Sequence, residues 1–151
     1  MKRLLALLLA LPLSATAATC SISSPGLNFG SISFLTTAGV QTQAPIDVAC
    51  DTTGIPAVIG FSDAGGALQA TGTSYMALQG VGSALYYRLY QDPARTIPWG
   101  QNNGTGATRL MPAHLTVYAS IPCADNTCYD TARPLRAGIY EGKNVTLSVA
   151  F

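Results

Sequence analysis

The stretch Ala-Leu-Tyr-Tyr-Arg-Leu-Tyr-Gln, residues 84–91, alternates between two sets of side chains. Successive side chains of an extended strand point to opposite faces of a sheet. One face of this stretch would therefore carry Leu85, Tyr87 and Leu89, and the other would carry Tyr86, Arg88 and Tyr90. This is the clearest strand of the chain, and we predict that it lies at the centre of a sheet.

Similar short alternating runs occur on both sides of this stretch, separated by Gly, Thr, Ser and Pro at intervals of about ten residues. No window shows a 3.6-residue apolar stripe with helix caps. The sequence thus predicts an all-β antiparallel sandwich or barrel. The strands would lie at Leu27–Phe34, around Ile46, Val48 and Cys50, at Pro56–Ser62 (inward Ala57, Ile59 and Phe61), Tyr75–Gln79, around Leu115, Val117, Ala119 and Ile121, and at 145–151.

Two details of this pattern give further expectations. The alternation of Leu27–Phe34 changes phase by one residue near Gly30, which predicts a β-bulge there. The segments 63–73 and 100–108 are rich in small or polar residues and indicate loops. The second loop is better explained as a long hairpin connection than as a ligand surface.

The N-terminus has the pattern of a secretory signal peptide. Met-Lys-Arg precedes the uncharged run Leu4–Leu13, and small residues follow it. A membrane span needs roughly 20 apolar residues, so we expect cleavage after Ala17 or Ala18 and no span in the mature chain. This divides the chain into a signal peptide, residues 1–18, and one β-sandwich domain, residues 19–151.

The four cysteines all lie in the predicted mature chain. An even number in an oxidising compartment indicates two disulfides, for which three pairings are possible. Cys123 and Cys128 are near enough in sequence to close a small loop, which leaves Cys20 to pair with Cys50. A structural metal site would need clustered Cys and His ligands, and this pattern is missing, so we expect neither a metal nor a cofactor.

Composition and polar residues favour a structural protein over an enzyme. Charged residues make up 10% of the chain and its formal net charge is +1, which argues against nucleic acid binding and fits a surface covered by partners. His114 is the only imidazole, and we expect it to face solvent. The acidic residues form no recognisable catalytic pair: Asp47, Asp51, Asp63, Asp92, Asp125, Asp130 and Glu141.

The aromatic residues leave one alternative function open. Tyr86, Tyr87, Tyr90 and Trp99 would form a sugar-binding platform in a free secreted carbohydrate-binding module. Because the tyrosines lie on both faces of one strand, a division between core and rim is the better explanation.

Several motifs together resemble the spore coat protein U family, and they span nearly the whole predicted mature chain. This family includes subunits of archaic chaperone–usher pili. The motifs are Cys20, Asn28-Phe29-Gly30, Cys50, Tyr87-Arg88-Leu89-Tyr90-Gln91-Asp92, Arg95-Thr96, Trp99-Gly100, Val117-Tyr118-Ala119-Ser120-Ile121-Pro122, and Ala137-Gly138-Ile139-Tyr140 with the ending 145–151.

The resemblance implies an immunoglobulin-like sandwich that lacks its last strand. A periplasmic chaperone would first fill the resulting groove, and the N-terminal extension of a neighbouring subunit would then add a strand in trans. The last strand would border the groove and bind the chaperone or a subunit through Val145, Leu147, Val149 and Phe151. An outer-membrane usher would be a further partner, and the protein would pass through the periplasm to the cell surface, in a pilus or as a spore-coat-like surface protein.

The chain departs from this family pattern in two places. Only Ala18 and Thr19 lie between the predicted cleavage site and Cys20, and two residues are too short to span a groove at about 3.3 Å per residue. We therefore expect a subunit that accepts a donor strand and cannot give one, at the end of a fibre, in an adhesive tip. The segment Cys123–Arg136 is longer than the usual turn and carries its own cysteine pair.

Overall fold

The computed structural model describes residues 18–32, 39–63, 71–78, 83–101, 105–122, 135–142 and 145–151. Most of the predicted signal peptide, Cys123 with Cys128, and Asp125 with Asp130 lie outside the described residues. The described part contains nine strands: β1 (Cys20–Ser23), β2 (Val40–Cys50), β3 (Pro56–Ser62), β4 (Thr73–Leu78), β5 (Ala84–Tyr90), β6 (Ala107–Leu110), β7 (Ala113–Ile121), β8 (Tyr140–Gly142) and β9 (Thr146–Ala150).

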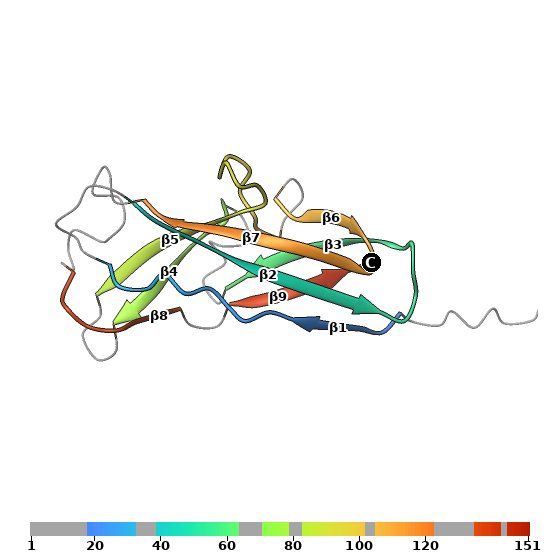
Figure 1. Ribbon diagram of the computed structural model, residues 1–151, viewed down its shortest axis with the longest axis horizontal. Coiled ribbons are helices and arrows are strands. Elements are labelled where there is room, and N and C mark those ends of the chain that lie inside the picture. Colours follow the sequence, from blue (N-terminus) through green and yellow to red (C-terminus); the bar gives the residue numbers. More distant parts are fainter. Residues whose placement is uncertain are drawn as a thin grey trace, which may run out of the picture.

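The strands form two antiparallel sheets, which confirms the predicted all-β sandwich. The larger sheet has the order β1-β2-β7-β5-β4-β8, and the smaller has the order β6-β3-β9. Figure 1 shows β2 and β7 crossing over β3 and β9, as two packed layers do. β5, which contains the alternating stretch at residues 84–91, lies between β7 and β4 in the larger sheet. The central position predicted for this strand is confirmed.

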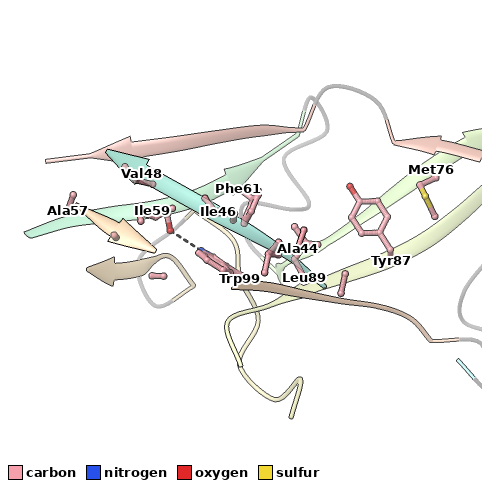
Figure 2. Packing of buried hydrophobic residues seen from close by; sticks show 14 of the residues in the cluster. Ala44, Ile46, Val48, Ala57, Ile59, Phe61, Met76, Tyr87, Leu89 and Trp99 are labelled. Atoms are coloured by element: carbon pink, nitrogen blue, oxygen red, sulfur yellow. Dashed lines mark hydrogen bonds between the residues drawn. The ribbon is translucent and has the colours of Figure 1, made fainter. Parts of the chain in front are cut away.

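The core forms between the inward faces that the alternation predicted. Leu85, Tyr87 and Leu89 of β5 are all at most 4% exposed, whereas Arg88 on the other face is exposed. Figure 2 shows Tyr87 and Leu89 in the same buried cluster as Ile46 of β2 and Phe61 of β3. The remaining buried members follow the same period: Ile46 and Val48 on β2, Ala57, Ile59 and Phe61 on β3, and Val117, Ala119 and Ile121 on β7.

Trp99 joins the two sheets through the core. Its backbone N–H donates to the carbonyl of Leu89 in β5, while its indole Nε1–H donates to the carbonyl of Ile59 in β3 at 2.9 Å. Its ring meets Phe61 edge-on, with ring centroids 5.2 Å apart (Figure 2). Only 1% of Trp99 is exposed, so one side chain links both layers by packing and by hydrogen bonds.

Asp92 stabilises the turn that connects β5 to Trp99. Its carboxylate accepts from the backbone N–H groups of Thr96 and Ile97 and from the Thr96 hydroxyl. Desolvation raises the pKa of Asp92, but these hydrogen bonds outweigh it and hold the pKa below its ordinary value. The Asp-x-x-x-Thr spacing therefore fixes a tight turn between β5 and Trp99.

We expect Trp99→Phe to destabilise the fold by about 2–3 kcal/mol, because it leaves the buried Ile59 carbonyl without its donor and opens space in the core. Urea unfolding followed by circular dichroism measures this. Tyr75→Phe is the matched control, since Tyr75 is 51% exposed and the change should cost under about 0.5 kcal/mol. Equal unfolding midpoints for the two variants would contradict the bridging role of Trp99.

The predicted strand Leu27–Phe34 is wrong for its described part. Residues 24–32 form no strand, because Gly30 takes a left-handed φ of 66° and its N–H donates to the Asn28 side chain at 2.8 Å. The change of phase itself is correct: Leu27, Phe29 and Ile32 are partly buried against the core. The segment thus packs like a strand without pairing like one.

Three short strands were not predicted. β1 has four residues, β8 has three, and β6 begins inside the segment that we assigned to a loop. β4 also begins two residues earlier than expected. All three missed strands lie at sheet edges, where one-sided contact leaves a weak pattern in the sequence.

Candidate functional site: an apolar groove beside β9

A groove opens along the sandwich where β9 and the β1 segment face each other. In the described part of the chain, β9 pairs only with β3 and β1 pairs only with β2. The cavity near them measures about 360 Å³ and is lined by Ile22, Ser24, Gly26, Leu27, Phe29, Ile46, Phe61, Met76, Tyr87, Leu89, Val117, Gly142, Val145 and Leu147.

The floor of this groove is the hydrophobic core itself. Ile46, Leu89 and Val117 line it, although each is at most 2% exposed in the folded chain. Leu27 and Phe29 form one wall and Leu147 the other, and all three also pack against the core. The groove therefore places partly buried side chains, its walls, beside core side chains that are already covered in the folded chain.

A second cavity of about 890 Å³ extends the groove along the molecule. It lies between residues 27–32 and residues 135–142. Four residues line both cavities: Leu27, Phe29, Met76 and Gly142. The wall at 135–142 is held by Tyr140, whose hydroxyl donates to the Arg136 carbonyl and accepts from the Arg136 N–H, both at 3.0 Å. The two cavities are therefore neighbours that share part of their lining.

Of the four residues predicted to bind a chaperone or subunit, only two lie in the groove lining. Leu147 pairs with Phe61 and Val149 with Ile59, so both face the core and are partly buried. Val145 and Leu147 line the groove, whereas Val149 and Phe151 do not. Phe151 follows the end of β9 and is 62% exposed. The alternation is confirmed, and binding of a chaperone or subunit by these residues stays a prediction.

The opposite wall is fixed at its base by a disulfide. Cys20 and Cys50 are bonded, as the sequence predicted. Next to this bond, the Thr19 N–H donates to the Asp51 carboxylate at 3.0 Å, and the Asp51 N–H donates to the Thr19 carbonyl at 3.1 Å. β1 is therefore tied covalently and by hydrogen bonds to the end of β2.

The sequence analysis did not identify one polar group in the groove lining, the Tyr87 hydroxyl. The Tyr87 hydroxyl is hydrogen-bonded to Ser74, and the Ser74 hydroxyl donates to the Asp63 carboxylate at 2.7 Å. Burial raises the pKa of Tyr87, and the charge of Asp63 adds to this, while the hydrogen bond with Ser74 lowers it. Nothing in the local pattern signals this chain, because its members come from different strands.

Comparison with known proteins identifies the family of this fold. The model of the Spore Coat Protein U domain matches residues 5–143 of the 151.

The chain belongs to the Spore Coat Protein U domain family.

A solved structure has a similar fold. It is the complex of CsuC and CsuE, chaperone and tip adhesion subunit before assembly, from the archaic chaperone–usher Csu pili of Acinetobacter baumannii. The match has a TM-score of 0.50 and 16% sequence identity, and covers 89% of this chain. The chain spans 40% of the length of the matched one. A comparison with curated protein sequences finds no match.

The sugar-binding platform proposed as an alternative does not form in this Spore Coat Protein U domain. Tyr87 is 4% and Trp99 is 1% exposed, because both complete the core. Tyr86 and Tyr90 are half-buried on the opposite face. The four aromatic side chains are therefore divided between the core and its rim, as the sequence favoured.

Outside the groove, the larger sheet has an exposed polar pair, His114 and Asp47. The His114 side chain is 85% exposed, as expected, and contacts Asp47 across the β2–β7 pair at 2.6 Å. No group of three potential metal ligands occurs in the described ranges. The same residues include no helix of the length and apolarity needed to span a bilayer.

Proposed function

We propose that this chain is a non-catalytic structural subunit of a secreted surface fibre of the chaperone–usher type. The groove between β1 and β9 accepts a strand from another polypeptide. The observation that carries this proposal is that the groove floor consists of core side chains, between two strands with unpaired edges in the described part. An extended chain satisfies both needs, since it buries apolar side chains and pairs with backbone groups.

The partners follow from the same geometry. An open groove is an aggregation hazard in a free subunit, so a periplasmic chaperone occupies it after secretion. A neighbouring subunit then replaces the chaperone during assembly at an outer-membrane usher, and the fibre is displayed on the cell surface. The name of the matched structure, a chaperone bound to a pilus subunit, supports this order of partners.

We place the subunit at the end of a fibre, in an adhesive tip position. Thr19 and Cys20 are bound to Asp51 and Cys50 of the subunit's own sheet. Because these residues are held within their own subunit, we propose that the subunit accepts a strand and gives none.

We test this function with the full chain and a synthetic peptide of about ten residues, the length of a long strand, with valine at alternate positions. Binding raises the melting temperature, because a ligand that binds only the folded state stabilises it, by about 2.7 kcal/mol at 100 times its Kd. A peptide of equal composition with its valines clustered is the control. Equal effects of both peptides would refute strand insertion, and self-assembled ladders of the pure chain on native gels would refute the acceptor-only role.

A further inference from the structure

We propose that the outward face of the larger sheet binds an acidic polysaccharide, a chain of uronic acid units, at a tyrosine-lined site centred on Arg88. This face points away from the core and from the groove, so it stays free when a strand occupies the groove. The inference goes beyond the proposed function, because it gives a ligand to a surface that strand insertion does not use.

Two pairs of tyrosines lie on this face, one on each side of Arg88. Tyr75 of β4 pairs with Tyr86 of β5, and Tyr90 of β5 pairs with Tyr118 of β7. Paired residues of neighbouring strands share a face. Tyr75 and Arg88 are exposed, and the other three tyrosines are half-buried. The two pairs are four residues, about 13 Å, apart along β5, so a ligand that contacts both is longer than one sugar ring.

This surface differs from the four-residue platform that the structure rules out. Tyr87 and Trp99 of that platform lie in the core. Tyr75 and Tyr118 instead join Tyr86 and Tyr90 on the outward face, because β4 and β7 pair with β5 on its two sides. The set therefore exists only in the paired sheet.

The centre of this face is positively charged and available to a ligand. The Arg88 guanidinium forms no hydrogen bond or ion pair in the part of the chain that the structure describes. The residues paired with Arg88 are the uncharged Thr73 and Ser120. Arg95 adds a second guanidinium, 5.8 Å from the centre of the Tyr118 ring.

The acidic side chains around Arg88 are engaged or distant. The Asp92 carboxylate is bound by the turn that follows β5. Glu141 of β8 pairs with Ala77 of β4. Ala77 is four residues, about 13 Å along the strand, from the position opposite Arg88. The charges on this face therefore favour an anionic ligand.

A uronic acid chain matches both the rings and the charge. The C–H groups on the face of a sugar ring pack against a tyrosine ring, which has an apolar body and a polar tip. The carboxylate of the same sugar pairs with a guanidinium through two parallel hydrogen bonds. Gln41 and Gln43 of β2 are exposed and pair with Ser120 and Tyr118, so their amides supply donors and acceptors for sugar hydroxyls.

Two other anionic partners fit this face less well. Nucleic acids and anionic membranes bind through rows or clusters of cations. Among the described residues, Arg88 and Arg95 are the guanidinium groups of this face, and the formal net charge of the whole chain is +1. The tyrosines therefore contribute more to this surface than its charge does, as in a sugar site.

The test measures binding of a galacturonic acid oligomer to the full chain by isothermal titration calorimetry. The methyl ester of the same oligomer is the neutral probe. The acid should bind about tenfold more tightly than the ester, because only the acid makes a charge-assisted hydrogen bond. Saturation with the alternating valine peptide should leave the affinity for the acid unchanged, since that peptide occupies the other side of the sheet.

Arg88→Gln removes the charge at an exposed position and should make the acid and the ester bind equally. Arg109→Gln is the matched control, because Arg109 is exposed on β6 of the smaller sheet, and it should keep the preference. Tyr86→Ala should weaken binding of both probes about fivefold through loss of one ring. Melting curves confirm that each variant is folded.

Equal affinities for the acid and the ester in the unaltered chain would overturn this inference, and so would a lack of binding by the acid. A preference that survives Arg88→Gln would overturn it as well. Tighter binding of single-stranded DNA or of anionic lipid vesicles would assign the face to another partner and overturn the sugar site. Each of these results leaves strand insertion intact, because the valine peptide tests the groove separately.

Discussion

Replacing Leu147 with aspartate is expected to abolish strand insertion and capture by a chaperone. Leu147 lines the groove and faces the core opposite Phe61. An inserted strand would bury the new carboxylate among apolar side chains with no cation to pair with it, which costs several kcal/mol. Affinity for the alternating valine peptide should fall at least about hundredfold, and co-purification with the periplasmic chaperone and periplasmic yield should fall with it.

Thr146→Asp is the matched control for this change. Thr146 is the neighbouring residue of β9, is exposed, and points to the opposite face. The same charge there should leave peptide affinity within about threefold, as a surface substitution does. Circular dichroism and melting curves of both variants separate lost binding from lost folding. A folded Leu147→Asp chain that still co-purifies with the chaperone would refute the groove as its binding site.

Removing the Cys20–Cys50 disulfide should be the most destabilising change outside the core. The bond closes a loop with a sequence separation of 30 residues, and its loss should cost about 3–4 kcal/mol in the chain-entropy description. For a domain of this size, the melting temperature should fall by roughly 10 °C. The double variant Cys20→Ala/Cys50→Ala, compared with the oxidised chain by calorimetry, measures this effect.

The same variant tests whether the disulfide supports the groove wall. Ile22 lies two residues after Cys20 and lines the cavity, so a loosened β1 should also weaken peptide binding. Ser21→Ala is the control, because its exposed hydroxyl makes only a 3.5 Å contact with the Ala49 carbonyl. An unchanged melting temperature in the double alanine variant would contradict the stabilising role of this bond.

The sequence alone predicted the strands that have one buried face. In β2, β3, β5 and β7 the alternation is local, and the apolar half of each pattern became the core. The Cys20–Cys50 pair followed from cysteine spacing in an exported chain. The alternation depends only on residues two positions apart in the chain, so the sequence alone contains it.

Only the tertiary structure decided which strands lie at edges and what lies between them. β1, β6 and β8 have three or four residues each, too few for an alternating pattern to be distinguished from a loop. Trp99 looked available for a ligand, yet it links the two sheets because Ile59, 40 residues earlier, supplies its acceptor. The groove was expected from family resemblance, but its lining joins residues from Ile22 to Leu147. The polar groups of Asp63, Ser74 and Tyr87 likewise come together from separate segments. Such contacts exist only after the strands have paired, because the side chains that form them are neighbours in space and not in sequence.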